Sequence, residues 1–322
     1  MTMDGGGNWK KLGLIFAPSG CDWMKTHAQN PLPEDLGDGR YRVHFAARDG
    51  QNRAHGGYFV FDIRNPRTVL EVSDVPTIGL GSLGAFDDCG VMPSGLVEWH
   101  GKKLMYYTGW SKAVEVPFSF HIGLAILEDN GRTYHRASLA PVLGRNHYDP
   151  FITGAPYVLK EGGLLRMWYI SATKWVKEFE NEKPKHYYTV KYAESPDGLS
   201  WTCSSHLCID YENAEYAIAR PVVWRTGRGY RMWFTYRGGQ DTYRVGIAES
   251  DDGVNWKRMK HSLGIDVSPE GWDSEMICYA HPLFWQGKMY ALYNGNAYGA
   301  TGIGLAVLES SINGSLGHTV VY

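Results

Sequence analysis

The sequence predicts an all-β fold, a five-bladed β-propeller with four antiparallel strands in each blade. Three observations carry this prediction: a fivefold internal repeat, a composition rich in Tyr, Trp and Gly, and few helical patterns. Propellers are built from such repeats, each of which forms one blade. We expect a single domain over residues 1–322, with blades that start roughly at residues 20, 84, 147, 213 and 273.

The composition supports a large folded core and excludes some partners. Of the 322 residues, 43% are hydrophobic and 14% aromatic, with 21 Tyr, 12 Trp and 39 Gly. Tyr and Trp favour strands, and Gly favours tight turns. The net charge is −2, so the chain offers no basic field, and we expect neither nucleic acid nor anionic lipid as a partner.

Targeting and cofactor motifs are not evident in the sequence. The apolar run at Leu12–Pro18 is too short for a signal peptide or a membrane span, so we expect a cytoplasmic protein without a membrane span. The five cysteines form no CxxC pair, which suits free thiols in a reducing compartment. We expect no metal site and no cofactor, since phosphate-binding and dinucleotide-binding motifs are also missing.

Each repeat begins with a predicted hairpin. A proline opens the first strand, and a glycine precedes the aromatic second strand, as in "GKKLMYYTGW" from Gly101 and "GYRMWFTYRGG" from Gly229. The prolines lie 62, 63, 65 and 61 residues apart, at Pro31, Pro93, Pro156, Pro221 and Pro282. This spacing predicts a hairpin with its turn at the glycine in every repeat.

Two further strands complete each repeat. "VKYAESPDGLSW" (Val190–Trp201) and "VGIAESDDGVNW" (Val245–Trp256) each predict a strand, a tight Asp-Gly turn and a strand that begins at the Trp. Both ends of the chain are also strand-like, at Leu12–Pro18 and His318–Tyr322. We expect either end to complete the last blade and so to remove an exposed sheet edge.

Acidic residues precede the proline in four repeats. They lie five to seven residues before it, at Asp87, Asp88, Asp149, Glu215 and Glu275. Because the innermost strand of a blade lines the central channel, we expect several of these carboxylates in one pocket. Carboxylates that crowd there have separated pKa values, which suits the cleavage of a glycosidic bond. The alternative is that these acids cap turns or bind backbone N–H groups.

Asp87 and Asp88 are expected to differ, because strand alternation sends neighbours to opposite faces. We expect Asp88 to face the pocket and Asp87 to hold a turn or the neighbouring blade. Arginines at strand ends can bind a carboxylate or phosphate, or can pair with acids as structural elements. The candidate substrate contacts are His27, Arg48, Asp49, Asp87, Arg220, Tyr236, Arg237, Glu275 and His281.

The repeated strands and the "AESxDGxxW" turns resemble a known superfamily over about residues 10 to 310. It is the five-bladed β-propeller superfamily that includes glycoside hydrolase families 32, 43, 62, 68, 117 and 130. The segments "THAQNP", "FAARD", "FDDCGVMPSG", "YYTGW" and "RMWY" are similar to uncharacterised members associated with bacterial polysaccharide or glycolipid biosynthesis. The resemblance implies a small-molecule or oligosaccharide substrate.

The resemblance also implies Glu215 as the general acid and Asp149 as the orienting group. The aspartate expected in the first blade has no clean counterpart, because Asp22 is misplaced and Asp88 comes from the second blade. We assign Asp88 the role of base or nucleophile. The sequence therefore predicts an enzyme that hydrolyses or transfers at a glycosidic bond. The alternatives are a carbohydrate-binding propeller without catalysis, and phosphorolysis or elimination on a modified sugar or natural-product precursor. In phosphorolysis, Arg48, Arg220 and Arg237 would hold the phosphate.

Overall fold

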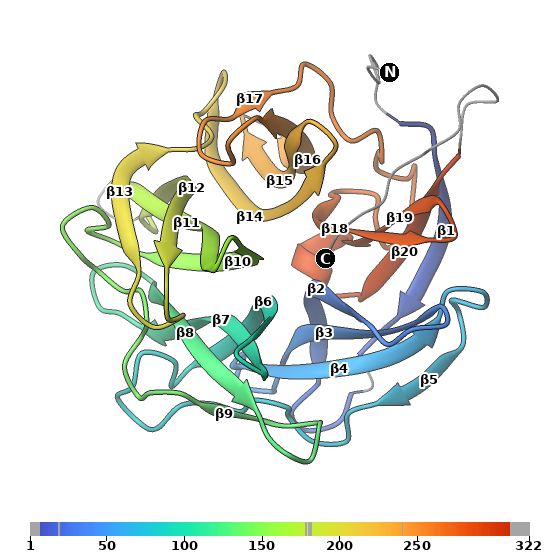
Figure 1. The fold of residues 1–322 in the computed structure, drawn as a ribbon, viewed down its shortest axis with the longest axis horizontal. Helices are drawn as coiled ribbons and strands as arrows, with labels where there is room; N and C mark the ends of the chain where they lie inside the picture. Colours follow the sequence, from blue (N-terminus) through green and yellow to red (C-terminus); the bar gives the residue numbers. More distant parts are fainter. Residues whose placement is uncertain (1–6, 19, 178, 180–181, 240, 310–322) are drawn as a thin grey trace.

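The computed structural model describes residues 7–18, 20–177, 179, 182–239 and 241–309. Regular structure is almost entirely strand, which confirms the all-β prediction. Consecutive strands pair as antiparallel units of four, arranged around a central axis (Figure 1). A single helical turn, α1 (Asn296–Gly299), interrupts this pattern in the described part of the chain.

The bounds of the strands follow the repeats. The first unit contains β2 (Thr26–Asp35), β3 (Arg40–Arg48), β4 (Ala54–Asp62) and β5 (Val69–Val72). The second contains β6 (Gly90–Trp99), β7 (Lys102–Lys112), β8 (Phe118–Leu127) and β9 (Tyr134–Arg136). The third contains β10 (Thr153–Glu161), β11 (Leu164–Val176), β12 (Lys185–Ser195) and β13 (Thr202–Leu207).

The two remaining units have the same order. One contains β14 (Glu215–Thr226), β15 (Gly229–Gly238), β16 (Asp241–Ser250) and β17 (Lys257–Arg258). The other contains β18 (Cys278–Trp285), β19 (Lys288–Asn294), β20 (Ile303–Leu308) and β1 (Trp9–Phe16). The N-terminal strand thus completes a unit built by the end of the described chain. Residues 318–322, the other strand expected there, lie outside the described residues.

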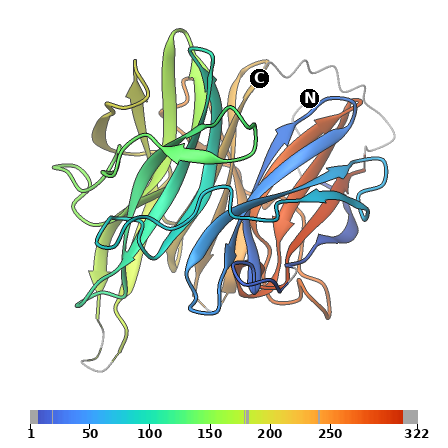
Figure 2. The same ribbon diagram turned by 90° about the horizontal axis from the view of Figure 1, so that it is seen from below.

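The first strand of each unit lies nearest the axis. These inner strands contact one another in the order β2, β6, β10, β14 and β18, and β18 contacts β2 again. Figure 2 shows the same units from the side, with the strands running across the thickness of the molecule. The starts of the inner strands therefore meet at one end of the axis.

A bulge bends the inner strands at corresponding positions. Asn30, Ala155, Arg220 and Tyr279 adopt left-handed backbone conformations, with φ of 58°, 44°, 50° and 55°. Each lies where the pairing register with the second strand shifts. Pro93 occupies the corresponding place in β6, at another register shift. Such conformations are costly outside glycine and persist only where the surrounding structure holds them.

Hydrogen bonds between units hold three of these bulges. The backbone N–H of Ala155 donates to Thr108 Oγ1 at 2.7 Å, and that of Tyr279 donates to Thr235 Oγ1 at 2.9 Å. The N–H of Asn30 donates to Asn294 Oδ1 at 2.9 Å, which joins the first unit to the last. In each pair, the acceptor belongs to the second strand of the preceding unit. We call these three bonds the seam bonds.

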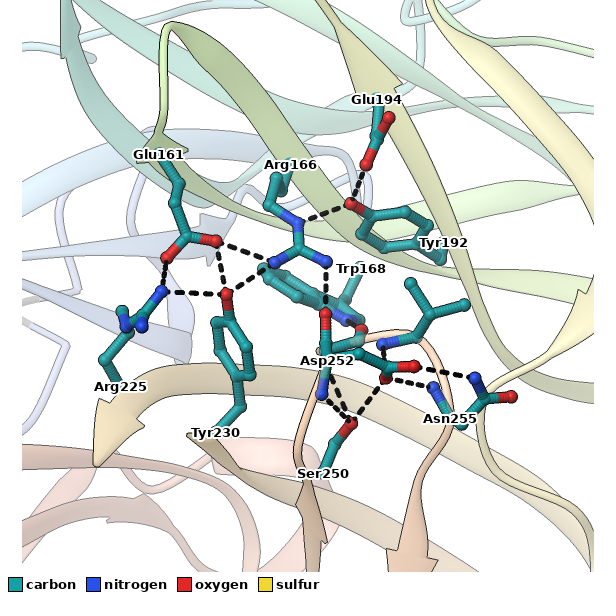
Figure 3. Close-up of polar contacts among 12 residues, drawn as sticks. Glu161, Arg166, Trp168, Tyr192, Glu194, Arg225, Tyr230, Ser250, Asp252 and Asn255 are labelled. Carbon is teal, nitrogen blue, oxygen red and sulfur yellow. Dashed lines mark hydrogen bonds and ion pairs between the residues drawn. The ribbon is translucent and has the colours of Figure 1, made fainter. Parts of the chain in front are cut away.

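The "AESxDGxxW" turns form a second type of connection (Figure 3). Asp252 Oδ1 accepts backbone N–H groups of Val254 and Asn255, both at 2.8 Å, which shapes the turn. Trp168 of the preceding unit then donates its Nε1–H to the Gly253 carbonyl at 2.7 Å. Tyr106 donates likewise to Gly198, in the corresponding turn, at 2.8 Å. The motif is therefore architectural, because each turn docks on the preceding unit.

The seam bonds should make a measurable contribution to stability. Asn294 is fully buried, and besides accepting from Asn30 it donates to the carbonyls of Ala28 and Gly302. We expect Asn294→Ala to lower the free energy of unfolding by about 3 kcal/mol or more, because three buried backbone groups lose their partners. Urea denaturation measures this, and Asn255→Ala, on an exposed turn, is the control. A loss below about 1 kcal/mol would contradict the role of the seam.

Candidate functional site

Three of the repeated aspartates have the same surroundings. Asp87, Asp149 and Asp273 are buried, and each accepts a hydrogen bond from a tyrosine 20 residues later, at 2.9, 3.0 and 3.1 Å. Each also forms an ion pair with a cation of the same unit. The cations are Arg136, Lys191 and Lys11, at 2.7, 3.0 and 2.8 Å. We call these contacts acid clamps.

The acid clamps follow strand register. Arg136 pairs with Ala125, and Lys11 pairs with Ala306, so both cations occupy the same place on the outermost strand. In the third unit Cys203 occupies that place, opposite Ala193. Lys191 of β12 supplies the cation instead, from the position directly beside Tyr169.

Glu215 belongs to a variant of the clamp. Phe234 stands where other units have the clamp tyrosine, and the acid lies one residue later in the chain. Glu215 forms a bidentate pair with Arg258, at 2.6 and 2.9 Å, and Arg258 has the same register as Arg136. The first unit has Phe45 at the ring position, and Lys25, 20 residues earlier, replaces the acid. The clamps thus account for Asp87, Asp149 and Glu215 among the acids that precede the prolines, and they do not include Asp88 or Glu275.

The predicted carboxylates consequently differ in their freedom to meet a ligand. Asp149 and Asp87 are fully buried, and Glu215 is nearly so, each in an ion pair. Asp88 is half-buried, and its Oδ2 accepts the Gly84 N–H at 3.0 Å. Its Oδ1 is buried beside the Cys89 thiol without a conventional hydrogen-bond partner among the described residues. The structure does not bring the three predicted catalytic carboxylates together in one cluster of contacts.

Two other predicted acids are turn residues. Asp49 accepts the backbone N–H groups of Gln51 and Arg53, both at 2.9 Å, between β3 and β4. It also pairs with the side chains of Arg53 and His55. Although burial opposes ionisation, these hydrogen bonds lower the pKa of Asp49 to about 2. Glu275 is exposed, and its backbone N–H binds Asn296 Oδ1 at 2.8 Å.

The predicted arginines, by contrast, come from three different units and adjoin a group of tyrosines. Arg237 lies over the Tyr243 ring, which packs against Tyr279 with ring centroids 5.9 Å apart. Burial lowers the pKa values of Arg48 and Arg220, and the nearby Tyr279 opposes this effect. Tyr279 is the bulge residue of β18. Arg220 is the bulge residue of β14, and its guanidinium donates to the carbonyls of Ser94 and Pro31, at 2.5 and 3.4 Å. It therefore reaches the inner strands of two other units.

Tyrosines enclose Arg237. Its guanidinium lies over the rings of Tyr216 and Tyr243, at 5.0 and 4.7 Å from their centroids, and Nη1 donates to the Tyr298 hydroxyl at 3.0 Å. Tyr298, in α1, has a left-handed φ of 62°, a strained conformation for a bulky residue. We call Arg48, Arg220, Arg237 and the tyrosines around them the arginine–tyrosine cluster.

An aromatic group adjoins this cluster. His186 stacks on Tyr188 with ring centroids 4.9 Å apart, and the Tyr188 hydroxyl is hydrogen-bonded to that of Tyr243. Trp175 and Phe118 pack against His186, at 4.9 and 5.2 Å. The arrangement presents aromatic faces from the second, third and fourth units next to cations. The sequence did not single out the tyrosines of this group or His186.

The other predicted contacts lie near the cluster or in the clamp. His27 begins β2 and interacts electrostatically with Arg48. His281 is buried and lies close to Arg220 and to the Tyr157 ring. Tyr236 lies under the Arg258 guanidinium, 5.5 Å from its centroid, and so belongs to the clamp of the fourth unit.

Burial makes the three histidines near the arginine–tyrosine cluster, His27, His186 and His281, weak bases. It lowers the pKa of His27 and His186 to about 4, and that of His281 to about 3. The nearby arginines Arg48, Arg237 and Arg220 lower these pKa values further. The three imidazoles are therefore neutral near pH 7, and the positive charge of the cluster belongs to its arginines.

Metal-binding clusters and membrane-spanning helices are both absent from the described residues. In that part of the chain, no three His, Cys, Asp or Glu side chains are arranged to hold a metal ion. No described helix is long and apolar enough to cross a membrane.

Comparison with known sequences decides the family. The chain is 42% identical over 304 residues to the uncharacterised proteins MT1551 and Rv1502 of two Mycobacterium tuberculosis strains, which covers 94% of this chain and 99% of each relative. The chain belongs to the family of these uncharacterised mycobacterial proteins. No general family model matches the sequence.

Solved structures with the same fold are glycosidase-like. A glycoside hydrolase superposes with a TM-score of 0.75 at 16% identity, over 95% of this chain and 93% of that one. A GH130 structure, from work on mannoside phosphorylases and hydrolases of β-1,2 mannosidic linkages in Candida mannan, gives 0.67 at 14% identity, over 95% of both chains. The Bombyx mori GH32 β-fructofuranosidase gives 0.63 at 14% identity, over 97% of this chain and 65% of that one. These likenesses establish a glycoside hydrolase-like fold for the family.

The acid clamp predicts a stability effect for Asp149. Asp149→Asn leaves Lys191, which is 4% exposed, without its counter-charge. We expect the free energy of unfolding to fall by about 3–5 kcal/mol, since one buried partner is removed. Urea denaturation at pH 7 measures the loss. Asp88→Asn, which breaks no ion pair, should cost less than about 1 kcal/mol, and equal losses in the two variants would contradict the clamp.

The neutral histidines predict a loss of stability in mild acid. Unfolded imidazoles take up protons near pH 6.5, whereas the folded ones at His27, His186 and His281 do so only near pH 3 to 4. Because the unfolded state binds more protons in this window, the free energy of unfolding should fall as the pH drops from about 6.5 to about 4.

Urea titrations at several pH values measure this dependence. His186→Phe keeps the aromatic stack on Tyr188 without a titratable group, and it should reduce the slope. An unchanged slope in this variant would show that His186 is not held neutral.

Proposed function

We propose that the chain is a carbohydrate-active five-bladed propeller that acts at a glycosidic bond, with the arginine–tyrosine cluster as its ligand site. The repeating four-strand units are read as five blades, and the ring of contacts among the inner strands supports this reading. The glycoside hydrolase-like fold supports the class of reaction. Fold alone does not assign an activity, so the proposal depends on the site.

One observation carries the choice of site: the Arg237 guanidinium lies over two tyrosine rings and donates to the Tyr298 hydroxyl, within a cluster of aromatic rings. Aromatic faces stack on the apolar face of a sugar ring, and guanidinium groups and tyrosine hydroxyls bind its oxygens. The strained backbone at Tyr279 and Tyr298 is also typical of functional positions.

Asp88 is the proposed proton-transfer carboxylate. It lies at the start of β6, and of the three carboxylates assigned catalytic roles it is the one without an ion pair among the described residues. A carboxylate without a cationic partner is freer to change protonation during the reaction. Asp149 and Glu215 are proposed to hold the starts of their strands in place.

A non-catalytic sugar-binding propeller is the second candidate. The pairing of Asp149 with Lys191 and of Glu215 with Arg258 favours it, because a two-carboxylate mechanism needs both groups open to the substrate. Phosphorolysis needs one protein carboxylate, and the cluster has the cations to hold phosphate. The candidates differ in the turnover and the sugar binding that they predict when Asp88 is neutralised.

The test is turnover of a panel of aryl glycosides, with and without inorganic phosphate, by Asp88→Asn. We expect at least about a 100-fold loss of kcat in this variant with folding unchanged, which is typical of a lost acid–base group. Glu215→Gln should lose stability, and its kcat under folding conditions should change far less. Sugar binding by a wild-type protein that turns over no glycoside would overturn the enzyme proposal in favour of the binding propeller.

A further inference from the structure

The arginine–tyrosine cluster has an excess of positive charge. Arg48 donates to the side-chain carbonyls of Gln29 and Asn52, at 3.1 and 3.0 Å. Arg220 donates to two backbone carbonyls, and Arg237 to a tyrosine hydroxyl. Among the side chains that the structure describes, which do not include that of Asp241, none of these three forms an ion pair with a carboxylate.

Other arginines of comparable burial are compensated. Arg136, Arg166 and Arg258 each pair with a carboxylate, and their side chains are 19%, 11% and 13% exposed. Arg166 binds Glu161 in the network of Figure 3, where the Glu161 carboxylate also binds Arg225 and the Tyr230 hydroxyl. The chain therefore places acids beside buried arginines at the clamps and between units, and omits them at the cluster.

Arg220 is the extreme case. It is 1% exposed, and its Nε–H has no hydrogen-bond partner among the described residues. Burial of an uncompensated charge costs several kcal/mol, and two carbonyl groups restore part of that energy. The Nε–H of Arg237 is likewise buried and without a partner. Two guanidinium groups of the cluster thus retain unused hydrogen-bonding capacity.

We propose that the arginine–tyrosine cluster binds an oxyanion, a carboxylate or phosphate group, of the ligand. The proposal rests on the proposed function for its carbohydrate setting and names the substrate class as an anionic sugar. Guanidinium groups bind both oxyanions with paired, charge-assisted hydrogen bonds, and a bound anion supplies the missing counter-charge. The half-buried ring of Trp175 packs on His186 beside Arg237, so a sugar ring attached to the anion lies against Trp175.

A purely structural role for the three arginines fits less well. A cation that only joins strands is best compensated by a carboxylate, as the acid clamps illustrate with Asp87, Asp149 and Asp273. At the cluster the groups that face the arginines are tyrosines, carbonyls and neutral histidines. These groups stabilise the cations and leave the net charge in place.

The experiment is isothermal titration of the full chain with inorganic phosphate, acetate, methyl glucuronide, glucose 6-phosphate and methyl glucoside at constant ionic strength. We expect saturable binding of the oxyanions, with the neutral methyl glucoside at least about tenfold weaker than the anionic sugars. Tighter binding of an anionic sugar than of phosphate or acetate shows that the oxyanion is part of the sugar ligand. Tighter binding of inorganic phosphate identifies it as a separate ligand.

The variants Arg237→Gln and Arg48→Gln should each weaken oxyanion binding by about tenfold or more, because a charge-assisted contact is lost. Arg231→Gln is the matched control: it lies on the same strand β15, and its guanidinium pairs with Glu249. Its oxyanion affinity should equal that of the wild type. Arg237 and Arg48 are partly exposed. The buried Arg220 is left unchanged, because its substitution threatens folding.

Two results would overturn the proposal. One is that none of the oxyanions binds saturably to the folded wild-type protein. The other is that both cluster variants bind them as tightly as Arg231→Gln does. Binding is measured without turnover, so an inactive protein that binds oxyanions through Arg237 refutes only the catalytic proposal, and an active protein indifferent to oxyanions refutes only this one.

Discussion

The left-handed bulge on the inner strands is the constraint on which the rest of the structure depends. In three units, the backbone N–H of the bulge residue is bound by Thr108, Thr235 or Asn294 of the preceding unit. Where the bulge is Pro93, no N–H exists to be satisfied, and Ala46 stands at the acceptor position. At the Arg220 bulge, the guanidinium itself binds the inner strands of two other units.

Charge is divided between two regions by this geometry. In four units, an acid at or before the start of the inner strand pairs with a cation of the third or outermost strand. Arg220 at a bulge, and Arg48 and Arg237 near the ends of second strands, donate instead to carbonyl and hydroxyl groups. Under the proposed function, a ligand at the cluster meets cations and aromatic rings, with the clamp carboxylates already paired.

Repeat alignment groups Asp87, Asp149 and Glu215 as equivalent residues, and each forms an ion pair within its unit. Counting from the proline predicts that these acids line the channel. The structure adds that Asp87 and Asp149 each accept a hydrogen bond from the tyrosine 20 residues later. Phe45 and Phe234 replace the clamp tyrosine in the two units that also lack the aspartate 20 residues earlier. The sequence alone therefore indicates that the aspartate and the tyrosine form a pair. Tyr279 and Tyr298 gave no such signal.

The sequence by itself determined the all-β class, the hairpin order, the docking turns and the equivalence of the repeats, because period, turn residues and spacing are local properties. It also singled out Arg48, Arg220 and Arg237, by their places beside the prolines and at strand ends. Only the tertiary structure decided that the three arginines lie among tyrosines and carbonyl groups, while Asp87, Asp149 and Glu215 form ion pairs within their own units. That choice depends on bulges and on register between strands far apart in the chain, where a shift of one residue reverses the face to which a side chain points.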